Sequence, residues 1–444
     1  MLMNRLRALW QNLNASLWFV PTLMVAGALL LAFGLVIIEP RLNLDGLRNY
    51  LLLFGAGADG ARGMLTAIAG SMITVAGLIF SLTLSTLAQV SSQYTSRVLR
   101  NFMRDRTNQV VLGFFVSIFA YCLIVLRTIR GGDEGRFIPS LAVGMGLMLA
   151  LLSIGVLIFF IHHMASSLQA ATIVGNAATE TEAAIARLFP DELGEQASAA
   201  ETQHLLRQAD QLTWHPVRAT ATGYVQSIDE DGVLALACTL RGVVRLEHGI
   251  GGFVARGEVL AAVASYEGRP VAQPADLTIQ VNDLFGCGGQ RTIEQDAGFG
   301  LRQIVDIALK ALSPGINDTT TAIICIDHLG ALLALLASRR LPGPLRAADD
   351  EDQVRVVAVR PTFGQFAASA FDQIRSSADG NVGVYLRLLK SLATVGQRTQ
   401  LPERRLALRQ QAELVGEAAQ RTLATAYEKD QVRERLAQLL PQLA

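Results

Sequence analysis

The chain has 444 residues and no net charge, and 51% of its residues are hydrophobic while only 17% are charged. This composition excludes a disordered chain, and four widely spaced cysteines exclude a disulfide scaffold. The zero net charge argues against a dedicated nucleic-acid binder, so no nucleic-acid partner is expected. The balance hides an asymmetry, because residues 1–163 carry 12 Arg against 6 acidic residues. We therefore expect the first part in a membrane and the remainder outside it.

Four long apolar runs lie in this first part. They span residues 17–38, 64–90, 110–126 and 137–161, and none contains a charged side chain. Because a bilayer core takes about 20 helical residues, each run is long enough to cross it. The first run is too long for a signal peptide and has no small-residue cleavage pattern. The sequence thus predicts four transmembrane helices, with both ends of the chain on one side.

The arginine distribution favours one orientation. The raw count of arginines on the two sides does not decide the orientation by the positive-inside rule. However, four arginines lie within a single ten-residue stretch after the second span: Arg97, Arg100, Arg104 and Arg106. The segment after the fourth span has neither a disulfide pattern nor a second signal. We therefore predict a multi-pass protein of the bacterial inner membrane, partnered by the lipid bilayer, with its N-terminus and its C-terminal domain cytoplasmic. His162 and His163 end the fourth span and are expected at the membrane interface.

The second span carries a polar stripe. Turning 100° per residue from Ser71 places its polar residues on one face about 120° wide. Leu78 lies in the middle of this face, and the helix is predicted to continue to about residue 100. The candidate pore-lining residues on this stripe are Ser71, Thr74, Leu78, Ser81, Ser85, Gln89, Ser92, Arg97 and Arg100.

Two interpretations fit the stripe. In the first, Gly77, Ser81 and Ser85 form a ladder of small residues that packs against another helix. In the second, copies of the helix surround a symmetry axis and line a pore, with Leu78 as a dewetting constriction. Arg97 and Arg100 then lie at the inner mouth. The pore requires a homo-oligomer and implies an ion or small solute as the transported species.

The rest of the chain reads as α+β. We predict a four-helix transmembrane domain at 1–163, juxtamembrane helices at 164–213, a small β-domain at 214–290 and a helical C-terminal domain at 291–444. Segment 252–260 resembles the barrel-sandwich fold of biotinyl and lipoyl carriers, but no lysine precedes Lys310 to hold such a cofactor. Segment 233–240 is predicted as a strand and Cys287 as part of a turn. Further predicted elements are helices at 296–312, 317–338, 365–377, 382–395 and 402–440 and a strand at 354–359.

Catalytic motifs are absent from the sequence. There is no P-loop, no dinucleotide fingerprint, no nucleophile elbow and no zinc spacing, so we expect no enzyme, metal or cofactor. One polar group could form a cytoplasmic site, either as acid, base and clamp of an enzyme or as an ion-pair network with helix caps. Its members are Asp296, Arg302, Asp306, Lys310, Asn317 and Asp318.

Two long segments resemble a known family. Residues 80–105 read FSLTLSTLAQVSSQYTSRVLRNFMRD, and residues 291–322 read RTIEQDAGFGLRQIVDIALKALSPGINDTTTA. Both are similar to segments of a bacterial family of predicted four-span membrane proteins named only for a domain of unknown function. The resemblance implies the membrane location and the order of four spans, β-unit and helical unit. The family often has Pro where this chain has Thr319, and Thr opens a helix equally well.

Three functions follow from these observations. The first is an oligomeric inner-membrane channel or transport protein, with the second span lining the path and a cytoplasmic assembly or sensor domain. The alternative is a membrane-anchored scaffold or sensor without a conduit, in which the stripe faces protein. The third is a membrane enzyme that uses the group from Asp296 to Asp318 in a pocket with shifted pKa values.

Overall fold

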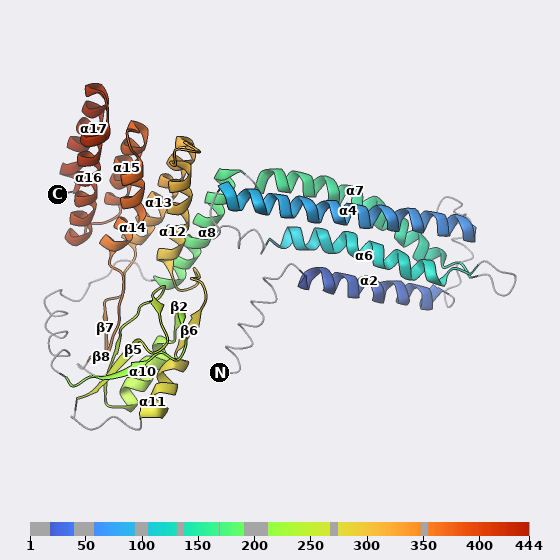
Figure 1. The fold of residues 1–444 in the computed structure, drawn as a ribbon, viewed down its shortest axis with the longest axis horizontal. Coiled ribbons are helices and arrows are strands. Elements are labelled where there is room, and N and C mark those ends of the chain that lie inside the picture. Colours follow the sequence, from blue (N-terminus) through green and yellow to red (C-terminus); the bar gives the residue numbers. More distant parts are fainter. Residues whose placement is uncertain are drawn as a thin grey trace. The chain divides into compact units, whose positions relative to one another are not determined.

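A computed structural model describes residues 18–39, 57–93, 105–130, 137–167, 169–190, 212–266, 274–347 and 354–443. The chain divides into two compact units, Met1–Thr172 and Ile173–Ala444. Figure 1 shows that the first unit consists of long helices, whereas the second combines small sheets with a stack of helices.

The first unit contains one helix for each predicted apolar run. These helices are α2 (Phe19–Ile38), α4 (Ala58–Gln93), α6 (Arg106–Thr128) and α7 (Ser140–Ser167). The described part of α4 begins six residues before the predicted apolar run. The predicted continuation of this helix to residue 100 lies outside the described residues.

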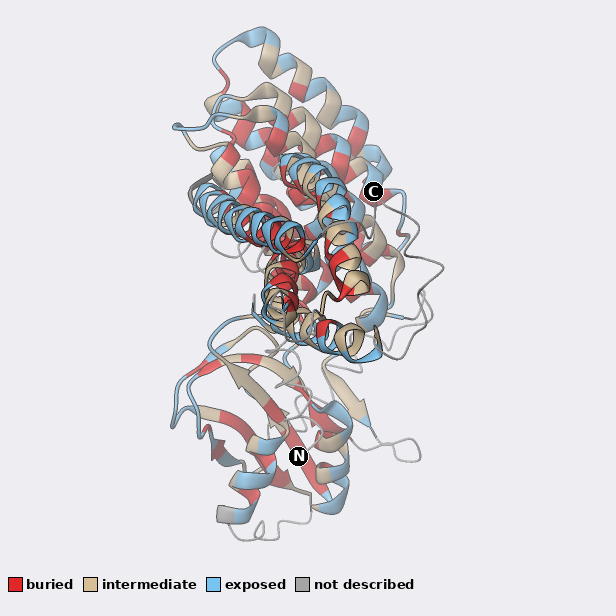
Figure 2. Cartoon of the chain, turned by 90° about the vertical axis from the view of Figure 1, so that its right-hand side faces the viewer, coloured by how far each residue is buried: buried red, intermediate tan, exposed pale blue. Residues whose placement is uncertain are grey.

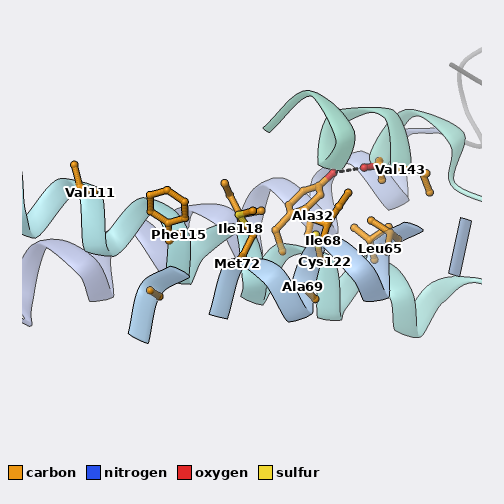
Figure 3. Packing of buried hydrophobic residues seen from close by; sticks show 14 of the residues in the cluster. Ala32, Leu65, Ile68, Ala69, Met72, Val111, Phe115, Ile118, Cys122 and Val143 are labelled. Carbon is orange, nitrogen blue, oxygen red and sulfur yellow. Dashed lines mark hydrogen bonds between the residues drawn. The ribbon is translucent and has the colours of Figure 1, made fainter. Parts of the chain in front are cut away.

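An apolar core joins these helices. Leu65 and Met72 of α4 belong to one buried cluster with Phe115 and Ile118 of α6, and Figure 3 shows Met72 beside Ile118. Buried residues follow the inner sides of the helices, whereas exposed residues cover the outer sides (Figure 2). The packing of the described bundle therefore rests on close apolar contact.

Polar contacts tie the helix ends together. The Tyr121 hydroxyl donates to the carbonyl of Ala142 at 2.7 Å, and Arg62 donates to the carbonyl of Ile129 at 3.0 Å. The backbone N–H of Leu141 donates to the Glu39 carboxylate at 3.1 Å, which satisfies a donor at the start of α7. These groups lie near the loops that follow α2 and α6.

Gly113 marks a close approach of α6 to α2. A Cβ at this position would lie 2.8 Å from the Met24 sulfur and 2.9 Å from the Pro21 Cα. Gly113→Ala is therefore expected to lower the free energy of unfolding by about 1–3 kcal/mol through overpacking. The control is Gly155→Ala on α7, where a Cβ meets nothing within 4 Å. Unfolding by SDS in bicelles measures both variants, and equal effects would contradict the α2–α6 packing.

Two sheets form the β part of the second unit. One has five strands in the order β1-β5-β3-β8-β7, and the other has three in the order β4-β2-β6. The β3–β8 pair is parallel, and the other pairs are antiparallel. The strands are β1 (His215–Arg218), β2 (Gly223–Ile228), β3 (Gly242–Leu246), β4 (Phe253–Val254), β5 (Val259–Ser265), β6 (Phe285–Gly288), β7 (Leu345–Ala347) and β8 (Val354–Val357).

Two local predictions in this part are wrong. Segment 233–240, predicted as a strand, lies in helix α10 (Glu230–Thr239), because Asp229 accepts the Gly232 N–H at 3.0 Å and caps a helix. Cys287, predicted in a turn, pairs with Val225 within the β2–β6 ladder. A second helix, α11 (Pro274–Asp283), also belongs to this part of the chain.

Strand β8 is predicted correctly, but its partner is distant in sequence. Its Val356 lies opposite Val244 of β3, so residues assigned to the helical part complete the five-stranded sheet. No local pattern reports such a pairing, because hydrogen bonding between strands depends on the tertiary fold.

The remaining helices form a stack. α8 (Ala170–Leu188) follows α7 in the chain, and after the sheets come α12 (Ala297–Ala311), α13 (Thr319–Ser338), α14 (Phe363–Ser377), α15 (Val382–Gly396), α16 (Pro402–Thr422) and α17 (Ala426–Leu439). The single helix predicted at 402–440 is wrong. Helix α16 ends at Thr422, and Thr425 forms a capping box with Glu428 that starts α17.

Within the described part of the chain, five helices are long and apolar enough to cross a membrane. They are α2, α4, α6, α7 and α13, so composition alone does not confirm the predicted number of four. The most apolar stretch of α13 is 56% buried inside the protein, close to the 50% of α6, but α13 belongs to the second unit. It packs against α12, α14 and α15.

Candidate functional site

The polar stripe of α4 lies on the side turned away from the other helices. The opposite side, with Leu65, Met72 and Ile79, is buried in the core of the first unit. Leu78, in the middle of the stripe, is 63% exposed. The described stripe residues, all exposed, are Ser71, Thr74, Leu78, Ser81, Ser85 and Gln89. The side chain of Ser92 and all of Arg97 and Arg100 lie outside the described residues.

A second pattern overlaps the stripe. Small residues recur along α4 at alternating spacings of four and three, which keeps them on one face. They are also exposed, and a Cβ added at Gly70 or Gly77 would meet nothing within 4 Å. We call this set the small-residue face; it consists of Gly63, Ala67, Gly70, Thr74, Gly77, Ser81 and Ala88, interrupted by Leu84. Such spacing allows two helix backbones to approach closely along a left-handed pair.

Two hydroxyls of the stripe are satisfied within the helix. Ser71 Oγ donates to the carbonyl of Ala67 at 2.8 Å, and Thr74 Oγ1 donates to the carbonyl of Gly70 at 2.8 Å. This bonding lowers the cost of apolar surroundings and leaves oxygen lone pairs free to accept from water. The geometry is therefore compatible with a wet face and with a packed one.

Asp105 links the start of α6 to the end of α7, a contact absent from the sequence predictions. Its Oδ1 accepts the Thr107 N–H at 2.9 Å and caps α6, while its Oδ2 lies 2.7 Å from His163 Nε2. The His163 ring stacks on Phe159 with 6.0 Å between centroids. The missed signal was an aspartate directly before a helix start, at the end of the segment that carries the family resemblance.

The polar group of the second unit is not gathered into one site. Asp296 caps the start of α12, whereas Lys310 lies in the last turn of the same helix. Between them, Arg302 and Asp306 form an ion pair of 2.8 Å one turn apart. Asn317 adopts a positive φ of 49° in the loop before α13, and Asp318 caps that helix. Among the described residues, no group of His, Cys, Asp and Glu is arranged to hold a metal ion.

Asp296 has a structural partner. Its carboxylate accepts from Arg291 Nε at 2.9 Å and from the Phe299 N–H at 2.9 Å. Burial raises the pKa of Asp296, while the Arg291 guanidinium and the hydrogen bonds act in the opposite direction. Gly251, with a φ of 81°, passes so close that a Cβ there would overlap the Asp296 carboxylate. The carboxylate thus fastens the turn at Gly251 to the start of α12.

Asp318 gives a pH-dependent prediction. Hydrogen bonds from Thr321 hold the pKa of Asp318 below its usual value. The ionised carboxylate therefore stabilises the fold above the unfolded pKa, and this contribution is lost as the pH falls through the lower, folded pKa. Asp318→Ala is expected to cost about 1 kcal/mol at pH 7, and Asp318→Asn less, since Asn also caps helices. Thermal unfolding at pH 7 and at pH 3 measures this, and an Asn variant whose deficit does not shrink between the two would contradict the assignment.

The chain is similar to known sequences over nearly its whole length. The model of a family described as predicted membrane protein (DUF2254) matches residues 14–394. An uncharacterized protein of Mycobacterium tuberculosis is 36% identical over 424 residues, which cover 95% of this chain and 80% of the relative. An uncharacterized protein of Mycobacterium bovis matches with the same identity and coverage. No solved structure matches the chain. The chain therefore belongs to the DUF2254 family of predicted membrane proteins.

Proposed function

We propose that this protein is a homo-oligomeric membrane channel in which copies of α4 line a central path. One observation carries the proposal: α4 turns its whole described polar stripe away from the apolar core of its own protomer. In a lone protomer this face would meet lipid chains, which cannot hydrogen-bond to it. In a ring it meets water and other copies of α4, and the small-residue face allows those copies to approach closely.

The channel has four spans in this proposal. The fifth apolar helix, α13, is treated as a core helix, because α12, α14 and α15 pack around it. Its own Asp327 forms an ion pair with Arg387 of α15, a contact typical of a soluble domain rather than of a lipid-facing helix. Both chain ends are then cytoplasmic, in the bacterial inner membrane, with the arginine-rich segment 97–106 on the inner side.

Leu78 and the arginines have distinct roles in this path. Leu78 is the most exposed large apolar side chain on the described stripe, at 63% against 41% for Leu82, so we assign the constriction to a ring of Leu78 side chains that would exclude water. Arg97 and Arg100 would lie at the cytoplasmic mouth and favour anions there. The second unit would serve as the assembly or sensor domain.

A scaffold or sensor without a conduit is the second candidate. The internal hydrogen bonds of Ser71 and Thr74 favour it, because hydroxyls satisfied in this way can pack dry against a neighbouring helix. Both candidates use the exposed face of α4 for assembly, and conduction separates them.

Cross-linking tests the assembly. Ser81→Cys is placed in a background with Cys238→Ser and Cys287→Ser, which leaves the buried Cys122 and Cys325. Mild oxidation in native membranes should give a covalent dimer, since neighbouring copies present the same face to the axis. Ile154→Cys on the exposed side of α7 is the matched control and should remain monomeric.

The particle mass gives the stoichiometry. The protomer is 47.7 kDa, and a ring around α4 requires at least three protomers after the detergent contribution is subtracted. A monomer or a dimer, or cross-linking at Ile154→Cys that equals cross-linking at Ser81→Cys, would contradict the central path.

A further inference from the structure

A cavity of about 330 Å³ lies within the second unit. Its walls come from the end of α8, the start of α10, the loop after α13 and strands β7 and β8. The loop contributes Pro342, Gly343 and Pro344, and the two prolines restrict the backbone of that wall. The channel proposal assigns no role to this cavity.

Three arginines from separate elements line the cavity. Arg340 follows α13, Arg346 lies on β7, and Arg360 follows β8. Arg360 donates to Glu230 at 2.6 Å, and Arg346 donates to Asp231 at 2.8 Å. Arg340 is exposed and forms no ion pair with the described residues. Arg346 and Arg360 thus share two carboxylates while Arg340 pairs with neither, which leaves an excess of positive charge at the cavity.

The guanidinium groups also have unused donors. Arg360 Nε is buried and has no hydrogen-bond partner within the described part of the chain. A guanidinium carries five N–H donors in a planar fork that matches an oxyanion. A buried N–H donor without an acceptor costs free energy. A ligand with acceptor oxygens would remove this cost by accepting hydrogen bonds from the Arg360 side chain.

The floor of the cavity is apolar. Val233, Leu246 and Val356 are buried beneath it, and Leu188 and Phe189 at the end of α8 form one wall. A cavity with an apolar body and a few converging polar groups is the usual form of a small-molecule site. The volume accommodates a compact molecule of about the size of a substituted aromatic ring.

We propose that this cavity binds a small organic anion, with its oxyanion held by Arg340 and Arg360 and its apolar body on Val233, Leu246 and Phe189. Phosphate and carboxylate heads share the required chemistry, because both accept bidentate hydrogen bonds from a guanidinium. Glu230 is the resident anion and would compete with the ligand for Arg360. The bound molecule would contact the end of α8, the helix that follows the last predicted span in the chain.

The test uses the full-length protein in nanodiscs and 4-fluorophenyl phosphate as the probe, observed by fluorine NMR. We expect saturable binding, with inorganic phosphate and 4-fluorophenol each binding more weakly because each lacks one half of the probe. Arg340→Gln and Arg360→Gln should each weaken binding about tenfold. Arg409→Gln, at an exposed arginine of α16, is the matched control and should leave the affinity unchanged.

The Glu230→Gln variant distinguishes a specific loss of binding from a loss of folding. It removes the competing carboxylate and should tighten binding several-fold, a gain that a misfolded protein would not give. Nanodiscs with and without phosphatidylglycerol separate two sources of the natural ligand. Competition by this lipid supports an anionic headgroup, and unchanged affinity supports a soluble anion. Absence of saturable binding, or binding indifferent to Arg340 and Arg360, would overturn the proposal, and neither result bears on conduction through α4.

Discussion

Replacing Arg404 by leucine is expected to lower the free energy of unfolding of the second unit by about 3–5 kcal/mol. Arg404 of α16 is 1% exposed, and its Nη1 donates to the carbonyls of Leu336, Ala337 and Arg339. Leu336 and Ala337 lie in the last turn of α13 and Arg339 is its C-cap, so the guanidinium covers the carbonyl end of that helix. Loss of the guanidinium would remove its hydrogen bonds to all three carbonyls, and the Leu336 carbonyl would keep only the Arg339 N–H.

The effect of Arg404 rests on geometry as well as charge. The guanidinium also lies over the Phe363 ring, 5.4 Å from its centroid. Burial lowers the pKa of Arg404, but a guanidinium remains charged at any pH at which the protein folds. Arg404→Lys keeps the charge and loses the planar fork, so an intermediate loss of about 2 kcal/mol is expected.

Thermal unfolding in detergent measures these variants. A loss of 3–5 kcal/mol corresponds to a fall of roughly 10 °C in the melting temperature of a unit of this size. Arg409→Leu on the same helix is the control, since its exposed pair with Glu413 contributes little. If Arg404→Leu and Arg409→Leu melt alike, the cap does not stabilise α13.

Leu78→Ser is expected to raise basal conductance by about tenfold or more, under the proposed channel. Each protomer contributes one Leu78 to the constriction, so the substitution replaces a complete apolar ring by hydroxyls and lowers the barrier to water and ions. Tenfold corresponds to a barrier change of only about 1.4 kcal/mol. Planar bilayers in potassium chloride suffice, because they report current whichever ion is carried.

Two further variants test the opposite change in current and the effect of a hydroxyl away from the path. Ser81→Leu adds a further apolar side chain to an exposed face that already carries Leu78 and Leu82, and it should reduce the current. Leu151→Ser, at an exposed position on α7, adds the same hydroxyl away from the path and should leave the current unchanged. A channel indifferent to both Leu78→Ser and Ser81→Leu would not be lined by α4. The scaffold interpretation would then be the better one, provided that Ser81→Cys still cross-links.

Hydrophobic periodicity and local signals for helix starts and ends were sufficient to predict most helices. The uncharged runs of the first 163 residues predict α2, α4, α6 and α7, because a run of about 20 apolar residues has the length of a helix that crosses a bilayer. Helices α12 and α13 were equally readable, since the Ser-Pro-Gly break and the caps Asp296 and Asp318 are local signals. The composition also distinguishes the apolar, arginine-rich first part from the rest of the chain.

The secondary structure of short apolar segments was predicted less well. Segment 233–240 has the same length and hydrophobicity as a strand, and only the Asp229 cap and the neighbouring sheet make it the helix α10. The break between α16 and α17 was missed because it contains neither Gly nor Pro. The capping box of Thr425 and Glu428 was the available signal.

Tertiary structure alone decided the groupings on which function depends. The stripe of α4 was visible in the sequence, but only packing shows that the opposite face is buried and that the stripe is left outside. The contacts Asp105–His163 and Arg404–Leu336 join residues that are 58 and 68 positions apart in the sequence. The cavity lined by Arg340, Arg346 and Arg360 combines side chains from Leu188 to Arg360. The sequence by itself determines what each segment is, because periodicity and caps act within a few turns. What the segments bring together depends on long-range contacts, whose free energy exists only in the folded chain.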